Sequence, residues 1–346
     1  MSLVIDYTSG FFEAAPTGET VGTSPAGDSS FSNVTLLLHG DGTNGSTSIT
    51  DSSSSPKTVT VNGNAQIDTT IKKFGTGSIE FDGTNSNLTL PSGLIGSGDF
   101  TIEYWVYGDA TSGNSSRHLD FGGTNRLIIY YQGASTTSAY DYSINVYDNN
   151  AGNQGVDNSL TLGNYRGNWN HVAVVKGSTV NNNGPGIALY LNGTKKSSRN
   201  TALDFTDASL TIGSTPTSSS WLNGFLDDIR ITNGVARYTS NFTPPTAPFL
   251  DTGPAIDATT GNVFNHAPSA DVAYAFTNPP SSGTSYDFTL KVTPSATVAI
   301  TWPASVEWPS GTAPAAPASG ETDVYTFFTT DGGSTYYGNQ VGDAVS

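Results

Sequence analysis

Short runs in which apolar and polar residues alternate recur along this chain, and tight-turn dipeptides separate them. The clearest run, residues 100–106, places Phe100, Ile102, Tyr104 and Val106 on one face of an extended strand. No segment of helical length shows an apolar stripe with a 3.6-residue period. The pattern therefore predicts an all-β chain. Asn-Gly pairs, which readily adopt the positive φ of tight turns, begin at Asn44, Asn62, Asn183, Asn192, Asn223 and Asn233.

The chain between Val34 and Ile231 carries about eleven such runs, which is typical of a two-sheet antiparallel sandwich. A jelly roll of about 200 residues is a reasonable size for one domain. The predicted strands are residues 34–38, 58–61, 78–81, 88–90, 100–106, 127–131, 143–146, 169–175, 187–191, 209–212 and 225–231.

A proline-rich segment, residues 243–248, marks a domain boundary because proline cannot donate to a strand ladder. We predict an N-terminal arm over residues 1–30, a jelly-roll domain over 31–250 and a small β domain over 251–346. The arm has no lasting hydrophobic period, so it is either a docking segment or a frayed terminus. Strands of the small domain are predicted at 272–276, 286–292, 298–302, 324–329 and 334–337.

Composition narrows the classes of partner. Lys plus Arg number 13 and Asp plus Glu number 29, which gives a net charge of −16. We expect no nucleic-acid binding, because phosphates require clustered cations. We also expect no membrane insertion, because no run of 18 apolar residues exists. The chain has no cysteine, which excludes disulfides, thiolate metal sites and thiol nucleophiles.

Three strong strands resemble core strands of laminin-G-like, concanavalin-A-like domains. The runs are GDFTIEYWV at 98–106, WNHVAVV at 169–175 followed by ALYLNG at 188–193, and NGFLDDIRI at 223–231. They occur in the order found in that family, and the resemblance covers residues 30–250. It implies a concanavalin-A-like jelly roll followed by a smaller β-sandwich.

Other segments resemble bacteriophage structural proteins. LLLHGDGTNG at 36–45 with TDSS at 50–53 is similar to the opening of such domains, and GVARYTSNFTPP at 234–245 is similar to their end. ETDVYTFFTTDGGSTYYG at 321–338, with ITWP at 300–303 and VEWP at 306–309, resembles the terminal domain of phage fibres and virion appendages. The resemblance implies a protein of the virion surface: a fibre, an appendage or a capsid decoration.

This resemblance also implies partners. Other virion proteins and host-surface polysaccharide are expected, together with a homo-oligomer in which a trimer is favoured. The alternative function is a calcium-dependent lectin, or carbohydrate-binding module, that is not tied to a virion.

Domains of the resembled family often hold Ca²⁺ near an edge of the sandwich, and this ion takes about six to eight oxygen ligands. Strict alternation places Asp227 on the face of Phe225, Ile229 and Ile231, where a buried carboxylate needs a partner. That partner is calcium, a backbone amide or Arg230. Hydrogen-bonded structural aspartates explain the same residues without a metal, and this interpretation is favoured. The candidate calcium ligands are Asp41, Asp51, Asp227 and Asp228.

Glycoside hydrolases that share this scaffold usually carry Glu-x-Asp-x-x-Glu on one strand, which aims the acids into one cleft. Glu80 and Asp82 begin that pattern, but the second glutamate is missing. Glu103 shares a face with Trp105, although an outward, solvated position on a strand explains Glu80 and Glu103 without a function, and this interpretation is favoured. We therefore expect no enzymatic activity.

Sugar rings stack on aromatic side chains, so exposed aromatics are candidate glycan-binding residues. Trp221, preceded by three serines, is the best candidate among the tryptophans. Tyr130 and Tyr131 begin an aromatic-rich stretch that predicts either sugar binding or a subunit interface. Trp169 is expected to lie in the core.

Overall fold

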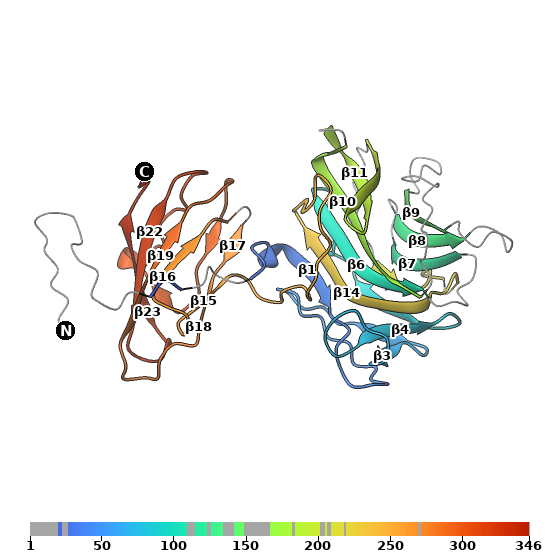
Figure 1. The fold of residues 1–346 in the computed structure, drawn as a ribbon, viewed down its shortest axis with the longest axis horizontal. Helices are drawn as coiled ribbons and strands as arrows, with labels where there is room; N and C mark the ends of the chain where they lie inside the picture. The colour runs from blue at the N-terminus through green and yellow to red at the C-terminus, as the bar shows by residue number, and fades with distance from the viewer. Residues whose placement is uncertain are drawn as a thin grey trace, which may run out of the picture. The chain divides into compact units, whose positions relative to one another are not determined.

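The structure is a computed structural model. It describes residues 20–22, 27–108, 115–122, 126–133, 142–148, 167–181, 184–200, 205, 209–217, 219–268 and 271–345, without the side chains of 115, 131–133, 142–148 and 310. The chain divides into two compact units (Figure 1). The larger unit spans residues 33–251, and the smaller combines residues 252–346 with the N-terminal residues 1–32.

The described residues of the predicted N-terminal arm belong to the smaller unit. Val21 forms a parallel β-bridge with Val263, and the Gly22 N–H donates to the Val263 carbonyl at 2.8 Å. The Asp28 N–H donates to the Thr252 carbonyl at 3.0 Å. Residues 1–19 and 23–26 of the arm lie outside the described residues.

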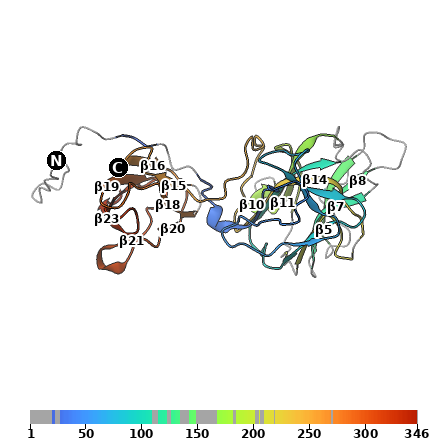
Figure 2. The same ribbon diagram turned by 90° about the horizontal axis from the view of Figure 1, so that it is seen from below.

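Two antiparallel sheets face each other in the larger unit, which confirms the predicted all-β sandwich (Figures 1 and 2). The eight-stranded sheet has the order β12-β11-β10-β6-β14-β4-β3, with β1 also paired to β14. Its strands are β1 (Val34–Leu38), β3 (Gln66–Asp68), β4 (Ser78–Asp82), β6 (Phe100–Gly108), β10 (Trp169–Asn181), β11 (Gly184–Leu191), β12 (Thr194–Arg199) and β14 (Asn223–Asn233). The six-stranded sheet contains, in spatial order, β2 (Thr60–Asn62), β5 (Asn87–Pro91), β13 (Ser209–Ile212), β7 (Ser115–Phe121), β8 (Leu127–Gly133) and β9 (Tyr142–Asp148).

Three of these strands were not predicted. β3 and β12 are edge strands with few apolar residues, so they lack the alternation that identifies a half-buried strand. β7 lies inside its sheet, but its buried residues include Ser116, His118 and Asp120. The hydrogen-bonded side chains of His118 and Asp120 occupy buried positions where apolar residues are expected, so a hydrophobic pattern does not reveal this strand.

The core of the larger unit lies between its two sheets. On β6 the predicted alternation is confirmed, because Phe100, Ile102, Tyr104 and Val106 are all buried in this core. One polar contact crosses it: Tyr104 Oη lies 2.9 Å from Nδ1 of His118, which comes from the opposite sheet. Burial lowers the pKa of His118 to about 3, so its imidazole is neutral at physiological pH.

After β14 the chain crosses the outer face of the eight-stranded sheet as a strap, which we define as residues 235–250. Tyr238 and Phe242 of the strap stack with ring centroids 3.6 Å apart and pack on Tyr190 of β11. The Phe242 N–H donates to the carbonyl of Gly193, a residue with φ of 75°. A Cβ on Gly193 would lie 1.9 Å from the Phe242 carbonyl oxygen, so this crossing requires glycine.

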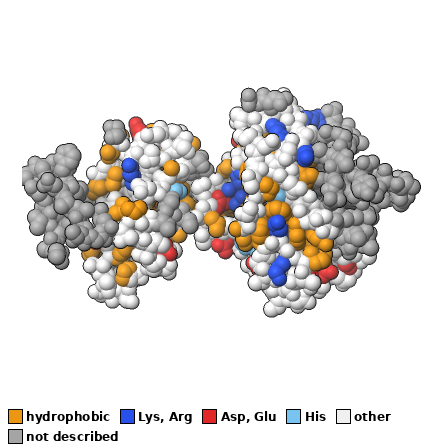
Figure 3. All heavy atoms as spheres, in the orientation of Figure 1, with side chains coloured by type: hydrophobic (Ala, Val, Ile, Leu, Met, Phe, Trp, Pro, Cys, Tyr) orange, Lys and Arg blue, Asp and Glu red, His pale blue; other side chains and the backbone are white. Residues whose placement is uncertain are grey.

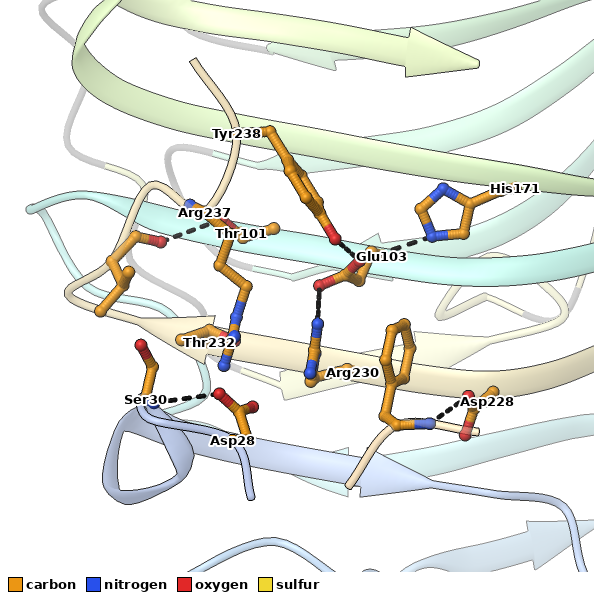
Figure 4. A network of polar contacts seen from close by, with 12 residues as sticks. Asp28, Ser30, Thr101, Glu103, His171, Asp228, Arg230, Thr232, Arg237 and Tyr238 are labelled. Atoms are coloured by element: carbon orange, nitrogen blue, oxygen red, sulfur yellow. Dashed lines mark hydrogen bonds and ion pairs between the residues drawn. The ribbon is translucent and has the colours of Figure 1, made fainter. Parts of the chain in front are cut away.

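A buried carboxylate holds the strap to the sheet (Figure 4). Glu103 of β6 is fully buried, and its Oε1 accepts hydrogen bonds from Arg230 Nε at 3.0 Å and Nη2 at 2.7 Å. Its Oε2 accepts one from the Tyr238 hydroxyl at 2.8 Å and lies 3.4 Å from Nε2 of His171. Burial alone would raise the pKa of Glu103, but the charge of Arg230 and the contact with His171 hold it well below its usual range.

The smaller unit has a five-stranded sheet of order β16-β19-β22-β23-β21 and two short parallel pairs, β15-β18 and β17-β20. Its aromatic core includes Tyr325 and Phe327, against which Trp302 and Trp308 pack. Among the described residues no helix is long and apolar enough to cross a membrane. The strands are β15 (Ala255–Asp257), β16 (Val263–His266), β17 (Val272–Ala273), β18 (Ala275–Thr277), β19 (Tyr286–Val292), β20 (Ile300–Thr301), β21 (Val306–Glu307), β22 (Asp323–Thr329) and β23 (Tyr336–Gly342).

Removing the charge of Glu103 tests the strap's attachment. In Glu103→Gln the buried Arg230 loses its counter-charge, so we expect the larger unit to lose about 3–5 kcal/mol of unfolding free energy. Tyr238→Phe deletes one hydrogen bond to the same carboxylate and should cost about 1–2 kcal/mol. Urea denaturation measures both, with Lys196→Ala on the exposed edge strand β12 as the control. Equal stability of Glu103→Gln and the wild type would show that the buried pair does not hold the strap.

The buried His118 should make the larger unit acid-sensitive. Below pH 6.5, the ordinary pKa of histidine, His118 is protonated in the unfolded chain. In the folded protein its pKa is about 3, so the imidazole stays neutral. Folded stability is therefore complete above pH 6.5 and falls with decreasing pH, by up to about 1.4 kcal/mol per pH unit for this group. The stability advantage of wild type over His118→Gln should shrink between pH 6.5 and pH 4.5, as followed by denaturant titrations. A constant difference across that range would contradict the assignment.

Candidate functional site

One row of side chains runs across five adjacent strands on the outer face of the eight-stranded sheet, beyond the residues that the strap covers. The register pairs Gln66 with Glu80, Glu80 with Phe225, Phe225 with Tyr107, and Tyr107 with Trp169. Directly paired residues on neighbouring strands point to the same face of a sheet. With strands about 4.8 Å apart, the row is about 19 Å long. We call these five residues the cross-strand row.

The β10 end of the cross-strand row is aromatic. Tyr107 lies between the other two rings, with centroids 5.6 Å from Trp169 and 5.9 Å from Phe225. Trp169 and Tyr107 are half-buried, whereas Phe225 is 8% exposed. Trp169 was expected in the core, and that expectation was wrong. Its indole lies on the opposite face of the sheet from the core residues Val172 and Val174.

The other end of the row opens into a polar cavity of about 460 Å³. This volume is within the range of small-ligand sites. Gln66 Nε2 donates to Glu80 Oε2 at 2.7 Å, and Asn64 Nδ2 donates to Asp82 Oδ2 at 2.9 Å. Each carboxylate is thus oriented by an amide. Glu80 keeps acceptor capacity for a further donor, whereas Asp82 already accepts four hydrogen bonds. The lining residues are Thr47, Gly63, Asn64, Ala65, Gln66, Glu80 and Asp82.

Asp82 is an ionised acceptor at neutral pH. Partial burial would raise its pKa, but hydrogen bonds involving Ser86, Thr84 and Asn85 outweigh it and hold the pKa well below its ordinary value. The Thr84 N–H and hydroxyl donate to this carboxylate at 2.9 and 2.8 Å, and the Asn85 N–H donates at 3.1 Å. An aspartate held in this state accepts hydrogen bonds and cannot serve as a general acid.

Between the row and the strap lies Asp227, whose surroundings differ from the prediction. The bulge at Asp228, where φ is 50°, breaks the alternation of β14. Asp227 therefore lies opposite Trp105 on the outer face, while Ile229 and Ile231 point into the core. The predicted placement of Asp227 beside these two isoleucines was wrong for this reason.

Backbone amides are the hydrogen-bond partners of the Asp227 carboxylate. Its Oδ2 accepts from the N–H groups of Lys73 and Phe74 at 2.7 and 3.1 Å, while Oδ1 has no partner among the described residues. Burial, assisted by the charges of Asp228 and Asp41, raises the pKa of Asp227 to about 7. Lys73 Nζ lies 4.0 Å from a ring centroid of Trp105, so a cation covers the neighbouring indole.

The other predicted calcium ligands already accept hydrogen bonds from the protein. Asp51 accepts from the N–H groups of Leu37, Ser53 and Lys57 and from the Ser53 hydroxyl. Asp41 accepts from the N–H and hydroxyl of Thr76. These contacts explain both carboxylates as structural residues of turns.

Asp228 is paired as well. His39 Nδ1 lies 2.6 Å from its Oδ1, and the Phe249 N–H donates to its Oδ2 at 2.7 Å. Burial lowers the pKa of His39, but the hydrogen bond and charge of Asp228 outweigh it and raise the pKa above its ordinary value. In the described part of the chain no group of three or more His, Cys, Asp and Glu residues is placed to hold a metal ion. The donors present do not fit a calcium cage, and calcium binding stays a prediction.

The predicted glycan-binding residues lie away from the cross-strand row. Tyr130 is half-buried on β8 of the six-stranded sheet, and the Arg117 guanidinium carbon lies 4.3 Å from its ring centroid. The backbone N–H of Arg117 donates to the Ser220 carbonyl at 2.9 Å. This hydrogen bond holds Ser220, the residue before the half-buried Trp221. The side chain of Tyr131 lies outside the described residues. These three residues stay a prediction for a second surface.

A family model described as "Concanavalin A-like lectin/glucanases superfamily" matches residues 82–237. The match runs from the end of β4 into the strap and includes strands of both sheets. No curated protein matches the sequence.

Several solved structures are similar to this chain. Domain 4 of AbnA, an extracellular arabinanase from Geobacillus stearothermophilus in complex with arabinotriose, is 19% identical, with 59% of this chain and 94% of that chain covered and a TM-score of 0.44. The receptor-binding domain of botulinum neurotoxin type G is 14% identical, with 90% and 66% covered and a TM-score of 0.45. Botulinum neurotoxin type C, whose cell entry depends on interaction with two ganglioside molecules, is 15% identical, with 62% and 49% covered and a TM-score of 0.43.

This chain thus spans about half to two thirds of the two neurotoxin chains. The fold assignment depends on the family match and on the strand order. The larger unit has two sheets of antiparallel strands, which agrees with the jelly roll that the sequence predicted. The larger unit has the concanavalin-A-like jelly-roll fold.

Proposed function

We propose that the larger unit binds a neutral polysaccharide along the cross-strand row. The observation that carries this proposal is the continuity of three aromatic rings with a polar cavity on one row of the sheet. Sugar C–H faces stack on aromatic rings, and sugar hydroxyls donate to carboxylate and amide oxygens. The row therefore offers both kinds of contact to one extended ligand.

The chemistry of the cavity favours an uncharged sugar chain. Its lining carries Glu80 and Asp82 and no lysine or arginine. The chain as a whole has a net charge of −16, which repels polyanions at low salt. Figure 3 shows hydrophobic side chains gathered around a few basic ones on the visible face of the larger unit.

We propose binding without turnover. Glycoside hydrolysis usually needs an acid of raised pKa opposite a second carboxylate. The hydrogen bonds to Asp82 lower its pKa, and Glu103 is fully buried beneath the strap with a lowered pKa. Asp227 has a pKa raised to about 7, but its side chain is fully buried and cannot reach a substrate. None of these three residues suits the role of general acid, which supports a lectin-like function.

Replacing Trp169 tests the site. Its half-buried indole contributes stacking surface and no core packing, so Trp169→Ala should weaken polysaccharide binding at least about tenfold, equivalent to about 1.4 kcal/mol, with little change in thermal unfolding. Affinity electrophoresis on neutral and acidic polysaccharides, repeated with a chelator, measures the effect. We expect the wild type to be retarded only in gels that contain a neutral polysaccharide, and to the same extent with and without the chelator.

Trp221→Ala and Tyr130→Ala are the matched controls, because both lie off the row. If these variants lost binding while Trp169→Ala kept it, the site would be on the six-stranded sheet or its rim, as the sequence predicted. A chelator-sensitive interaction would favour the calcium-dependent lectin. No retardation in any gel would exclude the proposed function.

We further propose that the protein is displayed on a bacteriophage virion as a fibre, appendage or capsid decoration. The support is the sequence resemblance of residues 36–53, 234–245 and 321–338 to phage structural proteins. On a virion surface, a polysaccharide-binding domain would attach the particle to its host.

Virion association has a direct test. Antibody against the larger unit should label intact particles in electron micrographs, and mass spectrometry of purified particles should find peptides of this chain. Adsorption to host cells should fall when free wild-type protein is added and should be unaffected by free Trp169→Ala. Particles that contain no peptide of this chain would contradict the virion proposal and leave the polysaccharide proposal intact.

A further inference from the structure

The smaller unit presents an outer sheet face on the side opposite its aromatic core. In β19, β22 and β23 alternate residues point inward, such as Phe288, Leu290, Tyr325 and Phe327. The intervening residues form the outer face (β19, β22 and β23 in Figure 1). Three apolar residues of this face are well exposed: Tyr337 at 57%, Phe328 at 41% and Val341 at 36%.

The register arranges this outer face in three parallel rows. The first row contains Asp287, Phe328, Tyr337 and Glu307, and the middle row contains Thr289, Thr326 and Asn339. The third row contains Lys291 and Val324, with Val341 beside them as the extra residue of a bulge in β23. The first row thus combines two aromatics with two acids, and the third combines two valines with one base.

These rows are complementary to each other under a two-fold rotation. The two-fold axis lies just above the outer face, parallel to the plane of the sheet and perpendicular to the strands, along the middle row. Rotation about it places a second copy face to face with the first. Each strand then lies over its own counterpart with the opposite direction, as in aligned sheet packing. Asp287 falls over Lys291 of the second copy, Phe328 falls over Val324, and Tyr337 falls over Val341.

The charges favour this arrangement over other occupants. Asp287 and Lys291 are both exposed, and they lie at equal distances on either side of Thr289. A two-fold axis over Thr289 therefore places Asp287 of each copy opposite Lys291 of the other, which gives two identical ion pairs. The middle row, which also includes Val263 of β16, meets its own counterpart, and there the hydroxyls of Thr289 and Thr326 and the Asn339 amide can exchange hydrogen bonds.

The area is that of a weak interface. Three strands of seven residues, one of four and one of two, at about 3.3 Å per residue and about 4.8 Å spacing, give a face of about 430 Å² per copy. Two copies would bury about 860 Å² in total, below the roughly 1,000 Å² expected of a stable biological interface. The complex should accordingly be a weak, concentration-dependent dimer.

We infer that the outer face of the five-stranded sheet binds a second copy of this chain, in an isologous two-fold dimer. The proposal is independent of the polysaccharide site, which lies on the larger unit. It also differs from the trimer that the sequence resemblance implies, because a two-fold axis in this position closes at two copies.

Sedimentation equilibrium of the full chain tests the inference. The average mass of the wild type should rise from that of a monomer towards that of a dimer as the concentration is raised from the micromolar into the millimolar range. K291D places like charges opposite each other and should weaken dimerisation at least about tenfold. The double variant D287K/K291D reverses both members of each pair and should restore the dimer, which also shows that the single variant failed through charge and not through misfolding.

Two further variants locate the interface. Y337K buries a charge against Val341 of the second copy and should give monomers, whereas L250K, a change at an equally exposed apolar residue of the larger unit, should leave the dimer intact. A wild-type monomer or trimer would overturn the inference. So would a dimer that K291D and Y337K leave unchanged, or a double variant that stays monomeric while its circular dichroism matches the wild type.

Discussion

A single buried charge, the carboxylate of Glu103, determines how the outer face of the eight-stranded sheet is used. An ionised group without solvent must have its acceptors filled, and Glu103 obtains its donors from two different parts of the chain: Arg230 of β14 and Tyr238 of the strap. The strap is therefore fixed over that half of the sheet. Phe249, whose ring lies 3.8 Å from the Arg230 guanidinium carbon, completes the cover. The remaining half of the same face is left to the cross-strand row.

The bulge in β14 makes this division possible. A regular strand would place Asp227 and Ile229 on one face and Asp228 and Arg230 on the other. The extra residue, with positive φ at Asp228, instead brings Asp227 and Arg230 to the same face. Arg230 then reaches Glu103, and Asp228 is released to bind His39 and the end of the strap. Bulges commonly redirect side chains next to functional surfaces, and this one separates a covered region from an exposed one.

The sequence predicted the sheets well wherever apolar residues mark a strand, either by alternation or by a short continuous run. β19 alternates in burial, whereas β1 and β13 are short apolar runs, and all three begin and end where the sequence indicated. The prediction was wrong at Asp227 because a bulge cannot be recognised from hydrophobicity, and at Trp169 because an indole on a strand carries no sign of which sheet face it occupies. The cross-strand row was not predicted at all. Its members are far apart in the sequence, from Gln66 to Phe225, and only the register of five strands places them together.

One signal for the site was nevertheless present in the sequence. Glu80 and Asp82 begin a hydrolase pattern in the sequence, although an outward, solvated position is the favoured interpretation of Glu80. The structure shows why half of that pattern is still useful. The second glutamate is missing, but the side chains oriented by Gln66 and Asn64 still offer carboxylate oxygens as hydrogen-bond acceptors. The proposed binding of a sugar chain without cleavage depends on this combination of acceptors and neighbouring aromatic rings.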